Sequence, residues 1–243
     1  MILLFDVGNT ALKMAFVKED EIIKTYLFST DVLKKADDFY LLIHPLISKY
    51  IFKKAAIASV VPHKTKELRE MILKHFYLKP FVVEPGVKTG LKIIADNPLE
   101  VGADIIAASV LYQNALIIDL GTAVKYLYVK NNTLRGVVIA PGLETSLKAL
   151  VDNTALLPNV EIKVPKTILG NNTVSCMQSG LVYGLVAQIE GMIKKISLEV
   201  NELPPVYLTG GYSELVYPLL EEEVIYEPKI VLLGLLKILK KNL

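Results

Sequence analysis

The chain has 243 residues, 52% of them apolar, and its 27 basic and 25 acidic residues leave a formal net charge of +2. This near balance gives no electrostatic case for binding nucleic acid, and the apolar fraction predicts a large buried core or a buried subunit interface. The single cysteine excludes an internal disulfide, and with three scattered histidines it gives no zinc-type cluster. We expect a cytoplasmic protein, because there is no signal-peptide pattern and no apolar stretch long enough to span a membrane.

The first predicted element is a β-hairpin. Residues 2–6 form an apolar run typical of a buried strand, and Gly8 and Asn9 supply a turn. Residues 11–18 alternate as the returning strand, and a third strand is expected at about residues 22–28. Helical segments then alternate with strands such as KAAIASVV, at residues 54–61.

A helix start is predicted at DNPLE. Asn97 is placed to cap the helix, Pro98 suits its first position, and Glu100 is spaced to close a capping box. This pattern predicts a helix that contains Gly102 and Asp104 one to two turns from its start.

The second half of the chain repeats the first. Residues 118–130, IDLGTAVKYLYVK, align with residues 5–18, FDVGNTALKMAFVK, at seven identities in thirteen pairs once Asn9 is left unpaired. A third strand at about 134–140 and a strand in PVYLTGG, at 205–211, continue the pattern. The order predicts an α/β protein of two like halves, residues 1–113 and 114–243.

Two helical segments of the second half have more than one interpretation. The predicted helix at 173–200 carries small residues on one face, and each glycine costs roughly 1 kcal/mol of helix propensity relative to alanine. These residues are Gly180, Gly184, Ala187 and Gly191. Either another helix of the chain or a second copy would pack on this face. The C-terminal KIVLLGLLKILKKNL is expected to pack its leucines on the core, with a helix lying on a membrane surface as the alternative.

The repeated Asp-x-Gly turn predicts phosphate binding. A carboxylate at the end of a buried strand can hold a hydrated cation, and glycine lets backbone N–H groups approach a phosphate. The hydroxyls of Thr10 and Thr122 add donors. One such turn alone would be read as an ordinary hairpin turn. The repetition favours two turns that clamp the phosphates of a nucleotide and its metal.

These motifs resemble the type III pantothenate kinases, within the acetate kinase, sugar kinase, heat-shock ATPase and actin superfamily. The resemblance covers nearly the whole chain and implies two similar ribonuclease H-like (actin-like ATPase) halves with a nucleotide cleft between them. It rests on DVGNT (6–10), IASVVP (57–62), PGVKTGLKIIADNPLEVGAD (85–104), DLGTA (119–123), IAPGLETSLKALVDNTALLP (139–158), ILGNNTVSCMQSGLVYGLVAQIEGMI (168–193) and TGG (209–211).

The resemblance implies ATP-dependent phosphorylation of the primary hydroxyl of pantothenate, the first step of coenzyme A biosynthesis. It also implies Mg²⁺ brought with ATP, a monovalent cation (K⁺ or NH₄⁺) and a homodimer. The general base would be Asp104, although a solvated helix residue is the usual role of an isolated aspartate. Substrate contacts would come from Gly102, Ala103, Asp104, Ile105 and, across the dimer interface, Thr173.

For the nucleotide, the resemblance assigns Asp119 to the monovalent cation and Asp6 to Mg²⁺ through water. Thr209, Gly210 and Gly211 would edge the adenine pocket, with a plain turn as the alternative for the two glycines. The phosphate contacts would be Asp6, Gly8, Asn9, Thr10, Lys13 and Thr122.

Three positions depart from the family pattern. Ala95 stands where relatives have tyrosine, Ile105 where they have arginine, and Lys125 where they have a small residue. A charge-assisted hydrogen bond is worth about 1.5–3 kcal/mol, so the absent guanidinium would weaken carboxylate binding roughly 10- to 150-fold unless another cation replaces it. Lys125 is a candidate for that replacement cation, although its place on the returning strand favours contact with the phosphates, and in that case it should face the nucleotide. Leu156 offers no replacement, because it stands where many relatives have lysine. Two alternatives therefore remain: a non-catalytic relative of the Bvg accessory factor type, and a kinase for another small hydroxy acid.

Overall fold

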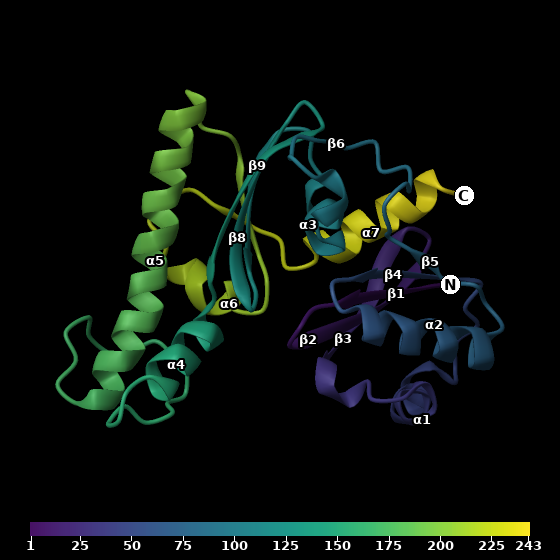
Figure 1. The fold of residues 1–243 in the computed structure, drawn as a ribbon, viewed down its shortest axis with the longest axis horizontal. Coiled ribbons are helices and arrows are strands. Elements are labelled where there is room, and N and C mark those ends of the chain that lie inside the picture. The colour runs from purple at the N-terminus through teal and green to yellow at the C-terminus, as the bar shows by residue number, and fades with distance from the viewer. The chain divides into compact units, whose positions relative to one another are not determined.

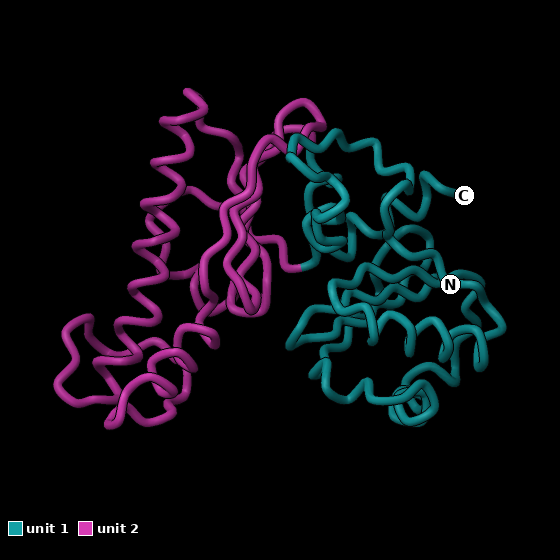
Figure 2. Tube along the Cα trace, in the orientation of Figure 1, with its two compact units in different colours: residues 1–112, 229–243 teal, residues 113–228 magenta.

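The chain forms two compact units, which are described separately (Figure 2). The computed structural model describes residues 1–243. Unit 1 joins Met1–Tyr112 to Lys229–Leu243, and unit 2 is Gln113–Pro228. The division expected from sequence, 1–113 and 114–243, differs from this at the C-terminus, because residues 229–243 pack with unit 1.

The sheet of unit 1 has the strand order β3-β2-β1-β4-β5 (Figure 1). Strand β1 pairs antiparallel with β2 and parallel with β4, so the predicted hairpin and the strand after it are confirmed. Leu3, Leu4 and Phe5 of β1 have no exposed surface, as expected for a central strand covered on both faces. The strands are β1 (Ile2–Val7), β2 (Ala11–Lys18), β3 (Glu21–Ser29), β4 (Lys54–Ser59) and β5 (Phe81–Val82).

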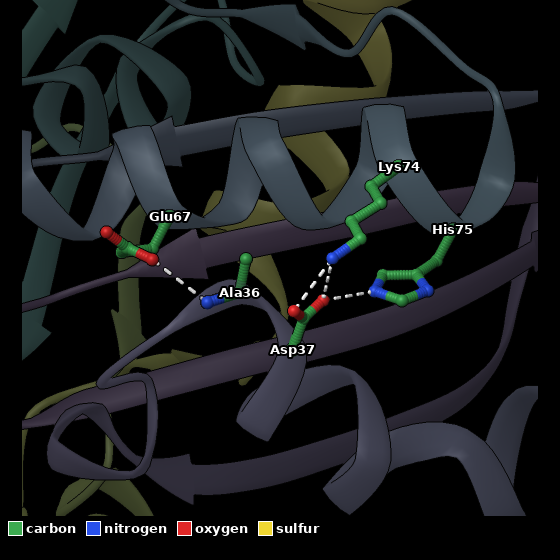
Figure 3. A network of polar contacts seen from close by, with 5 residues as sticks. All are labelled: Ala36, Asp37, Glu67, Lys74 and His75. Carbon is green, nitrogen blue, oxygen red and sulfur yellow. Dashed lines mark hydrogen bonds and ion pairs between the residues drawn. The ribbon is translucent and has the colours of Figure 1, made fainter.

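Helices α1 and α2 of unit 1 are joined by a polar network (Figure 3). Asp37, in the first turn of α1, accepts hydrogen bonds from Lys74 at 2.8 and 2.9 Å and lies 2.8 Å from Nε2 of His75. Glu67 of α2 accepts the backbone N–H of Ala36 at 2.9 Å, so a neighbouring helix satisfies one free donor at the start of α1. The remaining elements of unit 1 are η1 (Thr30–Val32), α1 (Ala36–Ile47), α2 (Pro62–Phe76), β6 (Lys92–Ile93), η2 (Pro98–Glu100), α3 (Ala103–Ser109) and α7 (Ile230–Lys241).

The predicted helix at residues 97–104 is divided into two pieces. Asn97 caps the first, η2, by accepting the N–H of Leu99 at 3.2 Å, but Glu100 bonds the Asn97 side chain at 2.7 Å and not its backbone. Val101 is extended, and Gly102 becomes the N-cap of α3. The prediction that Gly102 lies inside a helix was therefore wrong, since valine and glycine here interrupt it.

The C-terminal segment forms a core helix. Leu232, Leu235 and Leu239 are buried, and α7 (yellow) lies beside α3 (Figure 1). Lys237 donates to the carbonyl of Val110 at 2.7 Å, near the end of α3. The interpretation of this segment as a core-packing helix is confirmed. None of the helices is both long and apolar enough to cross a membrane.

Unit 2 repeats the topology of unit 1. Its strands follow the order β11-β10-β7-β8-β9, with β7 antiparallel to β8 and parallel to β10. A register irregularity falls at Phe16/Val17 in β2 and at Tyr128/Val129 in β8, which are matching positions of the sequence repeat. The elements are β7 (Ala115–Leu120), β8 (Ala123–Lys130), β9 (Thr133–Pro141), α4 (Leu143–Asp152), α5 (Thr173–Val200), β10 (Val206–Thr209), α6 (Ser213–Val216), η3 (Tyr217–Leu219) and β11 (Ile225–Tyr226).

Candidate active site

Each hairpin places an aspartate and a lysine directly opposite one another. Asp6 of β1 pairs in register with Lys13 of β2, and Asp119 of β7 pairs with Lys125 of β8. Each aspartate lies next to the turn that joins its two strands. The repeat seen in the sequence is therefore also a repeat of geometry.

The first turn is held from outside the hairpin. Gly8 donates its N–H to the carbonyl of Ala11 at 2.8 Å. Thr30, which follows β3, donates its hydroxyl to the carbonyl of Gly8 and its N–H to that of Thr10, both at 2.8 Å. The backbone at the predicted phosphate-binding residues is thus fixed by the fold.

The second turn is held in a similar way by the start of α4. Gly142 donates its N–H to the carbonyl of Thr122 at 3.0 Å, and the Thr145 hydroxyl donates to the same carbonyl at 2.7 Å. A Cβ at Gly142 would lie 2.2 Å from the carbonyl oxygen of Gly121. Only glycine therefore lets α4 approach this turn.

Lys125 forms an ion pair with Asp119. Its Nζ lies 2.7 Å from Oδ2 of Asp119, and both side chains are largely buried, with 14% and 12% exposed. Thr209 of β10 stands in register with Asp119 on the other side, and its buried hydroxyl has no hydrogen-bond partner within the chain. The sequence placed Thr209 at the edge of the adenine pocket, and no local pattern signalled that it would stand beside Asp119.

The two predicted adenine-binding glycines differ. Gly210 has φ +104°, and a Cβ there would lie 2.4 Å from the backbone N of Leu120, so the local backbone alone requires glycine. Nothing lies within 4 Å of a Cβ built at Gly211.

The next residue, Tyr212, donates a hydrogen bond to Glu144 at 2.7 Å. Burial raises the pKa of the Tyr212 hydroxyl, and this hydrogen bond raises it further.

Asp104 lies in the first turn of α3. Its Oδ1 accepts the N–H of Ile105 at 2.8 Å. A Cβ at Gly102 would lie 2.6 Å from that same oxygen and 3.2 Å from Val60. The absence of a side chain at Gly102 therefore makes room for Asp104 and Val60, in addition to any ligand.

A pocket of about 620 Å³ opens in unit 1 beside Gly102 and Ala103. Arg69 forms an ion pair with Glu84 at its edge. Lys66 also lines the pocket, and no sequence pattern signals this lysine beyond its place on the helix after IASVVP. Asp104 and Ile105 are not among the lining residues, which are Ser59, Val60, Pro62, Thr65, Lys66, Arg69, Val82, Val83, Glu84, Pro85, Leu99, Glu100, Val101, Gly102, Ala103 and Ile106.

Thr173 is the first residue of α5, in unit 2. Asn172 caps the helix by accepting the N–H of Ser175 at 2.9 Å, and the Ser175 side chain returns a bond to Asn172. This capping box fixes where α5 begins and so where Thr173 lies.

No group of three or more His, Cys, Asp or Glu side chains in the chain is placed to hold a metal ion.

Two units that each carry an antiparallel three-stranded meander followed by parallel strands define the ribonuclease H-like fold of actin-like ATPases and sugar kinases. Solved structures share it. A putative Baf family transcriptional activator from Campylobacter jejuni superposes with a TM-score of 0.64 at 19% identity, over 99% of this chain and 98% of its own. A putative 2-dehydro-3-deoxygalactonokinase from Sinorhizobium meliloti gives 0.62 at 11% identity, over 99% and 96%.

The chain belongs to the type III pantothenate kinase family. The family model for type III pantothenate kinase matches residues 2–195. A type III pantothenate kinase from Acholeplasma laidlawii is 47% identical over an alignment of 246 residues that covers 100% of both chains. The chain is thus a small-molecule kinase, and the reaction of its family is the phosphorylation of pantothenate in coenzyme A biosynthesis.

Proposed function

We propose that the chain transfers the γ-phosphoryl group of ATP to the primary hydroxyl of pantothenate, and that both hairpin turns contact the phosphates. The repetition supports this most directly. Asp6 and Asp119 hold the same register position, and each precedes a glycine turn tied down from outside its hairpin. The proposed phosphate contacts are Asp6, Gly8, Asn9, Thr10, Lys13 and Thr122.

Mg²⁺ would arrive with ATP and be held by Asp6 through water. Such an ion needs few protein ligands, since phosphates and water supply most of its coordination. Gly211 is the better candidate for the adenine edge, because it is open where Gly210 is required by the local backbone. Positioning and charge neutralisation then account for most of the catalysis.

Asp104 is the proposed general base. Its carboxylate would accept the proton of the pantothenate hydroxyl while that oxygen attacks the γ-phosphorus and ADP leaves. The side chain is oriented by the N–H of Ile105 and lies close to Gly102, which lines the pocket of unit 1. General-base catalysis of this kind typically contributes about 10² to 10⁴ in rate.

The pocket of unit 1 is the proposed pantothenate site. Its volume of about 620 Å³ falls in the usual range for small-molecule sites. Ile105 does not line it, and Lys66 does, so we assign the substrate carboxylate to Lys66 in place of the arginine that relatives carry. Thr173 of a second copy is proposed to contact the same substrate across the dimer interface.

A homodimer through α5 is part of the proposal. A Cβ built at Gly180, Gly184 or Gly191 meets nothing within 4 Å, so none of the three glycines is required by a close contact within the chain, although α4 lies near Gly180 and Gly184. Of the two alternatives that the sequence left open, we favour a second copy, because the space beside these glycines is open. We place the enzyme in the cytoplasm, which agrees with a single cysteine, Cys176, in the whole sequence.

ADP release with ATP, Mg²⁺ and pantothenate tests this function in the wild type and in Asp104→Asn. We expect pantothenate-dependent turnover in the wild type and a loss of about 10² to 10⁴ in the variant. A variant rate equal to the wild type would remove Asp104 as the base. Binding of ATP without any pantothenate-dependent turnover would favour the non-catalytic alternative, and turnover with another hydroxy acid alone would change the substrate.

A further inference from the structure

Three polar residues form a row across the sheet of unit 2. Thr209 of β10, Asp119 of β7 and Lys125 of β8 stand in register on adjacent strands. Residues in register point to the same face of a sheet, and Leu116, Ile118 and Leu120, which alternate with Asp119, belong to the core of unit 2. The row therefore lies on the face opposite that core, beside the turn at Gly121 and Thr122.

The row already contains a monovalent cation. The Lys125 ammonium lies 2.7 Å from Oδ2 of Asp119, and only 14% of the lysine side chain is exposed. An alkylammonium has the charge and the hydrogen-bonding chemistry of NH₄⁺ and is held here by the backbone of β8. A largely buried ion pair at hydrogen-bond distance is far less screened by solvent than a surface pair.

Apart from Lys125, the polar groups around Asp119 do not suit a second monovalent cation. A free K⁺ or NH₄⁺ bound to Asp119 would lie close to the Lys125 ammonium, and the two like charges would repel each other. The remaining polar group of the row, the Thr209 hydroxyl, is buried and neutral and cannot offset that repulsion. The monovalent cation implied by the family resemblance thus disagrees with the residues present.

We propose that Lys125 is the resident cation of the second hairpin, so that this kinase works without added K⁺ or NH₄⁺. The inference rests on the proposed function, since it assigns Asp119 and Lys125 to the phosphate-binding turn. Lys125 is a positioning residue in this account: it neutralises Asp119 and presents positive charge next to the turn.

Turnover should be measured at constant ionic strength in tetramethylammonium chloride and in KCl or NH₄Cl. The wild type is expected to show rates within about twofold in all three salts, because a site filled by a tethered charge gains nothing from a free one. Lys125→Thr is expected to lose most turnover in tetramethylammonium and to recover it with NH₄⁺ or K⁺. Lys125→Arg should keep the wild-type independence of salt.

Lys130→Thr is the matched control on β8, since Lys130 pairs with Glu202 away from the row. It should behave as the wild type in every salt. A wild type activated tenfold or more by K⁺ would overturn the proposal. So would a folded Lys125→Thr that is fully active in tetramethylammonium, or one that no monovalent cation restores.

Thallium binding gives a readout that does not need activity. Tl⁺ is a K⁺ analogue, and we expect Lys125→Thr, but not the wild type, to bind it and to gain thermal stability in K⁺ over tetramethylammonium. Equal Tl⁺ binding by both would overturn the proposal. If the wild type shows no pantothenate-dependent turnover in any salt, the proposed function fails, and the thallium measurement still decides the assignment of Lys125.

Discussion

Gly234 of α7 lies against the backbone carbonyl of Ala107 in α3: a Cβ on Gly234 would stand 1.7 Å from that oxygen. A separation so short cannot be relieved by turning a side chain, because the atom in the way belongs to the backbone. The contact joins residues far apart in sequence and attaches the C-terminal helix to unit 1.

Gly234→Ala is therefore expected to destabilise the protein, because overpacking a close contact usually costs about 1–3 kcal/mol. This packing cost should exceed the roughly 1 kcal/mol that alanine gains over glycine in a helix, so the net effect should be a loss of stability. Urea unfolding would measure it. Gly136→Ala is the control, because a Cβ there meets nothing within 4 Å. An unchanged unfolding midpoint in Gly234→Ala would contradict the close packing of α7 on α3.

Asp37→Asn is expected to lower stability at neutral pH, and its difference from the wild type is expected to shrink in acid. Hydrogen bonds from Lys74 and then His75 hold the pKa of the Asp37 carboxyl below its usual range. An aspartate with a lowered folded-state pKa stabilises the fold above its unfolded pKa, about 3.9, and this stabilisation is lost as the pH falls further. Urea unfolding at pH 7 and pH 3 would measure the difference, with the neighbouring exposed Asp38→Asn as the control. A difference from the wild type that does not shrink between pH 7 and pH 3 would show that Asp37 acts through something other than its charge.

Lys66→Met should raise the KM for pantothenate and leave kcat nearly unchanged. Removing one charge-assisted hydrogen bond to a carboxylate costs about 1.5–3 kcal/mol, which corresponds to roughly 10- to 150-fold in binding. Steady-state kinetics would measure both constants. Lys79→Met, an exposed lysine beyond α2, is the control. An unchanged KM in Lys66→Met would remove Lys66 as the partner of the substrate carboxylate.

Gly184→Glu should convert the proposed homodimer to a monomer. Glutamate has a higher helix propensity than glycine, so α5 should persist, whereas its charged side chain would prevent a second helix from approaching the stripe. Light scattering coupled to size exclusion would measure the mass. Gly136→Glu makes the same change at another open glycine and should leave the mass unaltered. A wild type that is already monomeric would contradict the proposed interface, and a dimeric Gly184→Glu would move it elsewhere.

Much of the hairpin geometry could be predicted from the sequence. Apolar runs, alternation and turn residues are local signals, and they placed β1, β2, β7 and β8 correctly. The repeat also predicted that Asp6 and Asp119 hold equivalent positions, since equal spacing from a turn fixes the register of a hairpin. The resemblance to the family rested on the two hairpin turns and on five further segments of the chain.

Contacts between distant segments were decided only by the tertiary structure. Nothing near Gly234 in the sequence signals that Ala107 will lie against it, and no local pattern shows that Lys66 would line the same pocket as Gly102. The partner of Lys125 was also left open, because a lysine side chain reaches several directions and its neighbours choose among them. Local periodicity determines which elements form; the shapes and charges that meet when the elements pack determine which residues share a site.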